Sequence, residues 1–169
     1  MKKGLLYALM VFLADQISKA FVLHYFSAHS SPVEVTSFFN FVLAWNKGVS
    51  FSMLHSNHPA MPWILVAVSL LICGMLIHWM SMEKEQFTIN CFGLIVGGAL
   101  GNVADRIRLG AVVDFLDFHI GLHHWPAFNV ADSAICVGAG IILIWNLFLA
   151  PTEKLSDPEK EKENDDSNA

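Results

Sequence analysis

The stretch GGALGNVADRIRLGAVVDF, residues 97–115, joins an apolar segment directly to a group of polar side chains. Its first half carries three glycines, which suit close packing between helices in a membrane. Its second half brings Asn102 and Arg106, which are four residues apart and therefore project from one face of a helix. Asp114 follows after a short apolar interval. Ionisable side chains where a membrane span ends raise the question of a functional site, although a carboxylate costs less there than at the bilayer midplane.

The composition of the chain predicts an integral membrane protein. The 169 residues are 54% hydrophobic and only 15% charged, with a mean hydropathy of +0.50, which is too apolar for a soluble domain of this length. The 22 residues from Met61 to Met82 carry no formal charge and would span roughly 33 Å as a helix, enough to cross a bilayer. Further apolar blocks predict four transmembrane helices in a single domain over 1–150, at about residues 4–24, 61–82, 86–108 and 130–150, of which the first and last carry polar intrusions.

The two ends of the chain are expected on the same side of the membrane, because the number of spans is even. Lys2 and Lys3 place that side in the cytoplasm, although Lys47, Arg106 and Arg108 on the opposite side weaken the rule unless they have specific roles. The first span lacks a cleavage site and is expected to be retained. Residues 151–169 carry seven acidic and three basic residues and are predicted to be a disordered cytoplasmic tail.

Two segments on the outward side do not have a helical pattern. In residues 31–54, apolar side chains from Phe39 to Trp45 alternate with period two, residues 46–48 provide a turn, and Val49 to Leu54 returns with further β-formers. This pattern predicts a small antiparallel β cradle on the membrane surface. The segment 109–129 is predicted to be a loop, with aromatic residues suited to the headgroup region.

Two aspartates are expected to meet at the outer surface. Asp114 follows the third span and Asp132 begins the fourth, so both lie at the same depth. Two carboxylates in one site do not both ionise readily, so one keeps a proton near neutral pH and the pair can hydrolyse a peptide by general acid–base catalysis. Alternatively, Asp132 simply favours the helix dipole after an Asn129 N-cap, and Asp114 and Asp117 are exposed loop residues.

Asp15 and Lys19 lie one turn apart in the first span and can pair with each other. Either the helix ends early and Lys19 extends towards the headgroups, or the two residues support a pocket on the outward side. Arg106 is likewise either an anchor at the membrane interface or a fixed positive charge that orients a carboxylate.

Five motifs then identify a family. They are D-Q-I-S-K at 15–19, N-K-G-V-S-F at 46–51, G-G-A-L-G-N-V-A-D-R at 97–106, V-V-D-F at 112–115 and F-N-V-A-D-S at 128–133. Each is weak alone, but their order across four spans closely resembles the bacterial signal peptidase II family, the lipoprotein signal peptidases. The resemblance covers residues 15–133 and does not extend to the acidic tail.

The resemblance implies an aspartic endopeptidase of the bacterial inner membrane, without metal or cofactor, whose active site lies near the periplasmic face. Its substrates would be prolipoproteins carrying diacylglycerol on a cysteine, cut immediately before that cysteine, and its inhibitors would include globomycin. The matching positions make Asp114 and Asp132 the catalytic pair. The residues that would support the pocket are Asp15, Lys19, Asn46, Gly48, Asn102, Asp105, Arg106 and Asn129. A monomer in contact with membrane lipids, with no nucleic-acid partner, is expected.

Two other classes of protein are weighed against this interpretation. A transporter would distribute acidic residues through the bilayer, whereas here they cluster at the outer ends of the spans. A metalloenzyme would use His119, His123 and His124 with Asp117, but there is no helical H-E-x-x-H and Gly121 interrupts the spacing. The three cysteines are expected to be inert packing residues within the spans.

Overall fold

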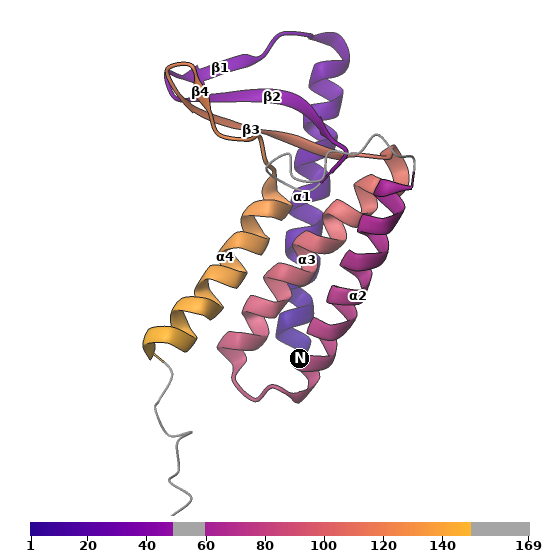
Figure 1. Cartoon of the computed structure of the whole chain (residues 1–169), viewed down its shortest axis with the longest axis vertical. Helices are drawn as coiled ribbons and strands as arrows, with labels where there is room; N and C mark the ends of the chain where they lie inside the picture. The colour runs from indigo at the N-terminus through magenta and orange to yellow at the C-terminus, as the bar shows by residue number, and fades with distance from the viewer. Residues whose placement is uncertain (49–59, 150–169) are drawn as a thin grey trace, which may run out of the picture.

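The structure is a computed structural model that describes residues 1–48 and 60–149. Four helices carry a small sheet at one end (Figure 1). In chain order the elements are α1 (Lys2–Ala28), β1 (Val33–Thr36), β2 (Phe39–Asn46), α2 (Met61–Met82), α3 (Gln86–Leu109), β3 (Val112–Ile120), β4 (His123–His124), α4 (Val130–Ile144) and the π-helical turn η2 (Trp145–Leu149).

The four predicted spans are confirmed. Helices α1, α2 and α3, and α4 continued to Phe148, are each long and apolar enough to cross a membrane. Helix α3 lies at the centre and contacts the other three. Large apolar side chains on the outer faces, such as Phe21 and Leu71, are mostly exposed, as expected for surfaces that face lipid rather than water. The chain is therefore a multi-pass membrane protein.

Glycines let α3 approach its neighbours, as the opening stretch predicts. A Cβ atom at Gly98 would collide with the main-chain oxygen of Ala131 on α4. At Gly101 it would lie 2.5 Å from the Asp15 carboxylate on α1. Because the sequence provides no side chain at these two positions, α3 brings its polar end directly against α1 and α4.

The sheet is antiparallel, with strand order β1-β2-β3-β4. The prediction of a cradle from residues 31–54 was incomplete. Of the two strands paired with β2, β1 lies in this range, but β3 comes from the segment predicted to be a loop after the third span. In this pairing Ala44 faces Asp114 and Phe39 faces Phe118. The β-branched and aromatic residues of β3 fit a half-buried sheet. The predicted strand from Val49 to Leu54 lies outside the described residues.

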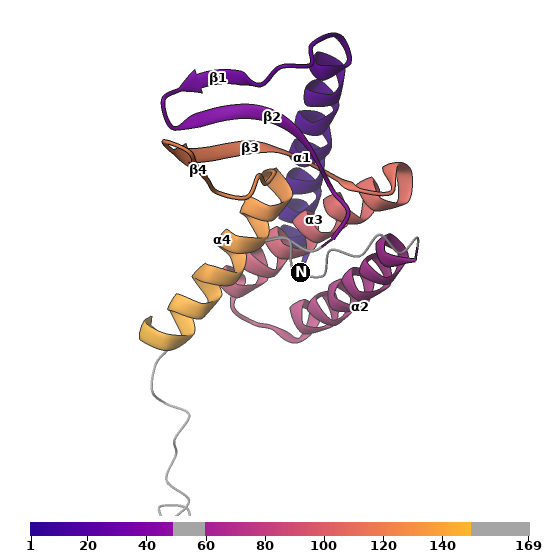
Figure 2. The same ribbon diagram turned by 45° about the horizontal axis from the view of Figure 1, so that its top comes forward.

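The end of α3 and the beginning of α4 position the two segments that carry Asp114 and Asp132. Helix α3 ends at Gly110, whose φ of 75° is the left-handed C-cap conformation that glycine readily adopts, and β3 then starts two residues later. Helix α4 begins with Asn129 as its N-cap, as predicted. Figure 2 shows the sheet across the end of the bundle that lies away from the α2–α3 connection.

Candidate functional site

Asn129 connects the two candidate aspartates. Its Nδ2 atom donates to Asp114 Oδ1 over 2.7 Å, while its Oδ1 atom accepts from the main-chain N–H of Asp132 over 2.9 Å. Its own N–H donates to Asp132 Oδ2 over 3.3 Å, which completes a capping box. Asn129 is fully buried. Asn129 therefore links β3 to the start of α4, because its side chain binds the Asp114 carboxyl group and its main-chain N–H binds the Asp132 carboxyl group.

Asp114 lies inside the protein rather than on an exposed loop. Only 2% of it is accessible, and its second carboxyl oxygen accepts a hydrogen bond from Asn46 Nδ2 over 3.0 Å. Burial is the largest cause that raises the pKa of Asp114 to about 7, and the negative charge of Asp132 adds to it. The hydrogen bonds from Asn46 and Asn129 act in the opposite direction. Near neutral pH, a substantial fraction of Asp114 therefore carries a proton.

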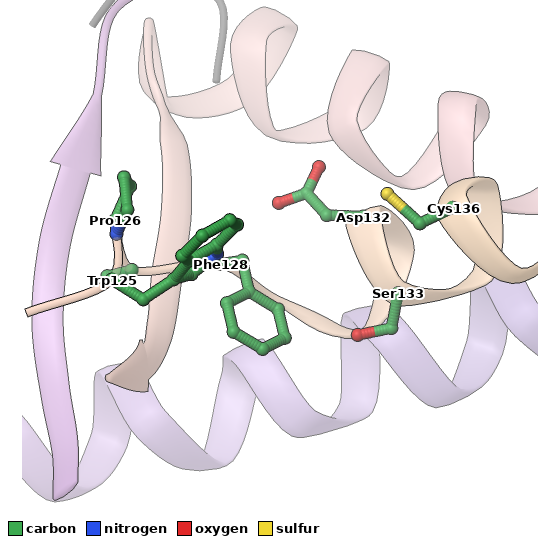
Figure 3. Close-up of a pocket in the computed structure, with 7 residues that line it drawn as sticks. Trp125, Pro126, Phe128, Asp132, Ser133 and Cys136 are labelled. Carbon is green, nitrogen blue, oxygen red and sulfur yellow. The ribbon is translucent and has the colours of Figure 1, made fainter. Parts of the chain in front are cut away.

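Asp132 is half-buried and lines two cavities. One, of about 250 Å³, is walled by Trp125, Pro126 and Phe128 together with Ser133 and Cys136 (Figure 3). Figure 3 shows the Asp132 carboxyl group pointing into the space between the aromatic residues and α3.

The second cavity beside Asp132, of about 300 Å³, lies between α2, α3 and α4. Its lining includes the polar residues Asn46, Asn102 and Arg106. Asn102 Nδ2 donates to Asp132 Oδ1 over 2.8 Å. Asp132 thus lines both cavities, whereas Asp114 is in neither lining.

The pocket-supporting residues predicted on the first and third spans form a buried ionic cluster. Lys19 Nζ lies 2.8 Å from both Asp15 and Asp105 carboxylates and 3.0 Å from Asn102 Oδ1. Lys19 is only 2% exposed and α1 continues to Ala28. The alternative in which the helix ends early and Lys19 extends towards the headgroups is therefore wrong.

The positively charged residues that weaken the topology rule have structural partners in two of three cases. Arg106 Nη2 donates to the main-chain oxygen of Gly48 over 2.9 Å, which connects α3 to the chain after β2. Arg108 Nη1 donates to Gln16 Oε1 over 3.0 Å. Lys47 is exposed. Arg106 also lines the second cavity with Asn102, so this face of α3 points into the site as expected.

Asp117 belongs to a separate cluster at the far end of β3. It is buried, not the exposed loop residue of the alternative interpretation, and it accepts hydrogen bonds from Asn40 over 3.1 Å and His124 over 2.8 Å. Burial acts to raise the pKa of Asp117, but the hydrogen bonds from His124 and Asn40 outweigh it and lower the pKa. His119 stacks on His124. In the part of the chain that the structure describes, no three His, Cys, Asp or Glu side chains gather as a metal site requires.

Sequence reasoning missed the roles of two residues. Gln16 Nε2 donates to both Asp15 and Asp105, and its place in the D-Q-I-S-K motif was the available signal. Cys136 was expected to be a packing residue, but it is exposed and lines both cavities. Its position one helical turn after Asp132 could have revealed this. Cys73 and Cys91 are buried, as expected.

Comparison with known proteins gives consistent results. Residues 7–148 match the family model described as signal peptidase (SPase) II. The lipoprotein signal peptidase of Aeromonas hydrophila is 44% identical over 139 residues, covering 81% of this chain and 83% of the relative. That of Teredinibacter turnerae is 42% identical over 152 residues, covering 89% and 90%.

A solved structure described as a bacterial membrane enzyme, determined by the in meso method at 2.3 Å resolution, superposes with a TM-score of 0.76. It is 27% identical, and the match covers 93% of this chain and 94% of that structure's chain. The sequence match extends over nearly the whole membrane region, and the structural match includes both the four helices and the sheet. This chain belongs to the signal peptidase II family.

Proposed function

We propose that this chain is an aspartic endopeptidase that removes the signal peptide from diacylglyceryl-modified prolipoproteins, cutting immediately before the lipidated cysteine. Family membership supports a peptidase that processes lipoprotein precursors. The observation that carries the aspartic mechanism is the bridge through Asn129, which holds Asp114 and Asp132 in one site. Two carboxyl groups held in this way can divide the roles of acid and base.

Asp132 is assigned as the general base, because it lines both cavities and is therefore the carboxylate that water can reach. It removes a proton from the attacking water. Asp114 is assigned as the general acid, because its pKa of about 7 lets it hold a proton near neutral pH. It gives that proton to the oxygen of the scissile carbonyl as the C–O bond to water forms.

The tetrahedral intermediate then collapses. Asp132 returns the proton that it took from water to the departing amine nitrogen, and the C–N bond breaks. Asp114 recovers its proton from the intermediate as the new carboxyl group forms. The pair finishes in its starting protonation state, so no covalent acyl-enzyme and no metal ion is required by this scheme.

The site's surroundings suit a lipid-modified peptide. The cavity beside Asp132 in Figure 3 is walled by Trp125, Pro126 and Phe128, and Leu65, Val68 and Ile135 contribute apolar surface to the second cavity. Both are lined in part by α4, whose other residues include exposed apolar side chains such as Leu143. A precursor whose diacylglyceryl group stays in the bilayer could thus present its peptide bond to Asp132.

The arrangement in Figure 1 supports a topology for the enzyme. The beginning of α1 and the end of α4 lie at the end of the bundle opposite the sheet. With Lys2 and Lys3 in the cytoplasm, the site faces the periplasm and the sheet lies on the outer surface of the inner membrane. We propose a monomeric peptidase domain over residues 1–150 that contacts membrane lipids and is inhibited by globomycin-type peptides.

The experiment that tests this function is cleavage of a purified precursor. The protein in detergent is incubated with a diacylglyceryl-modified prolipoprotein and with the unmodified precursor, and the products are weighed by mass spectrometry. A single cut before the lipidated cysteine, made in the modified precursor and unaffected by a chelator, is expected. A cut at another bond, or no cut by a folded protein, would refute the proposed activity.

A further inference from the structure

Each of the three N–H donors of the Lys19 ammonium group has an acceptor. The acceptors are the Asp15 and Asp105 carboxylates at 2.8 Å and Asn102 Oδ1 at 3.0 Å. None of the three charged side chains is more than 2% exposed. A buried ion cluster of this kind contributes little to stability compared with apolar packing. Because burying these charges costs desolvation free energy, we expect the cluster to have a role other than stability.

Each carboxylate of the cluster also accepts a main-chain N–H next to a proposed catalytic aspartate. Asp15 Oδ1 accepts from Ala131, the residue before Asp132, over 2.9 Å. Asp105 Oδ2 accepts from Val113, the residue before Asp114, over 3.1 Å. One ammonium group, through two carboxylates, thus fixes the backbone of both segments that carry the reacting groups.

A third contact of the cluster sets the orientation of an amide. Lys19 can only donate, so the atom of Asn102 that faces it is the oxygen. The amide nitrogen of Asn102 must then point the other way, where it donates to Asp132 Oδ1 over 2.8 Å. Without the ammonium group, the longer hydrogen bond from Asn129 Nδ2, at 3.3 Å, would still hold the Asn102 oxygen. An amide that turned over would present its oxygen to the Asp132 carboxylate, and the two oxygens would repel each other.

We propose that the ion triad Asp15–Lys19–Asp105 is a positioning device that aligns Asp114 and Asp132 for reaction. This inference rests on the proposed function and concerns how its two aspartates are held. The triad does not touch the reacting groups itself. It acts through the N–H groups of Val113 and Ala131 and through the Asn102 side chain, and the positive charge of Lys19 also lowers the pKa of Asp114.

The test is Lys19→Met in the full-length protein, assayed on the diacylglyceryl-modified precursor. Because misplacement of a reacting group by about 1 Å costs on the order of 100-fold in rate, kcat is expected to fall by about that factor while KM stays within about twofold of wild type. The matched control is Lys84→Met, which removes an exposed lysine between α2 and α3 and should leave both constants unchanged.

A double-mutant cycle with Asn102→Ala separates positioning from a general structural role. If Lys19 acts partly through Asn102, Lys19→Met should cost clearly less in the Asn102→Ala background than in wild type. Additive losses would overturn the coupling, and an unchanged kcat or a loss confined to KM in Lys19→Met would overturn the proposal.

A second pair of variants decides the matter if Lys19→Met fails to fold. Asp15→Asn keeps an oxygen that can accept from Ala131, whereas Asp15→Ala does not, so kcat should fall further in the alanine variant. Equal kcat values for the two would refute the positioning role. Wild type and Asp114→Asn are assayed in parallel, because an inactive wild type or an active Asp114→Asn would refute the proposed function instead.

Discussion

Replacing Asn46 by leucine should move the pH dependence of the reaction in a defined direction. Asn46 Nδ2 donates to Asp114 over 3.0 Å and lowers the pKa of that carboxyl group. A hydrogen bond to a charged group contributes about 1.5–3 kcal/mol, and 1.36 kcal/mol corresponds to one pH unit. Because Asn46 is only half-buried, we expect the lower end, a rise of about one pH unit from the value of about 7.

The assay is the pH profile of kcat/KM, which reports the ionisation of the free enzyme. If protonated Asp114 is the acid, activity falls above its pKa, and Asn46→Leu should shift this alkaline limb upwards by about one pH unit. Asn40→Leu is the matched control, because Asn40 makes the same kind of bond from the same strand to Asp117. An alkaline limb that stays in place in Asn46→Leu, or moves to lower pH, would refute the assignment of Asp114.

Three further predictions concern stability, each read from the thermal midpoint in detergent. Gly101→Ala should destabilise the protein by about 1–3 kcal/mol, because the added Cβ would lie 2.5 Å from the Asp15 carboxylate. Gly140→Ala is the control, because a Cβ atom there meets nothing within 4 Å. Equal thermal midpoints for the two variants would contradict the close approach of α3 to α1. Asn129→Ala should cost at least the ~1 kcal/mol of an N-cap and also abolish most activity; an active variant would show that the bridge between the aspartates is dispensable. The pKa of Asp114 is raised from 3.8 to about 7, so the stability linked to this group is complete below about pH 4 and is lost as pH rises through about 7. The midpoint of wild type should therefore fall over this range by more than that of Asp114→Asn, and parallel curves would contradict the raised pKa.

The helical part of the fold and the polar face of α3 could be predicted from the sequence because both depend on local patterns. Apolar blocks of membrane length, the first of them interrupted by Asp15 and Lys19, predicted the spans. The i,i+4 spacing of Asn102 and Arg106 predicted that both lie on one face of α3, and this face lines the second cavity. The Asn129 cap followed from its place directly before an apolar helix. None of these features requires knowledge of distant contacts.

The sheet and the ion triad were only partly predictable because they depend on pairing between distant segments. The alternation in β2 indicates a strand, but its partner β3 comes from the segment between the third and fourth spans. From the sequence alone, Asp114 in that segment could equally be an exposed loop residue. For Lys19 the sequence left two interpretations open, because a lysine near a helix end either extends to the headgroups or pairs inside the protein. Its two carboxylate partners come from different helices, and only their packing decides between these.

The most direct test of the account compares three single substitutions in the precursor-cleavage assay: Asp114→Asn, Asp132→Asn and Asp117→Asn. Asp117 is the internal control, since it lies on the same strand as Asp114 and is also buried. The account predicts that cleavage before the lipidated cysteine is lost in the first two variants and retained in the third, all three remaining folded. Cleavage that persists in either Asp114→Asn or Asp132→Asn would contradict the central claim that this pair performs the hydrolysis.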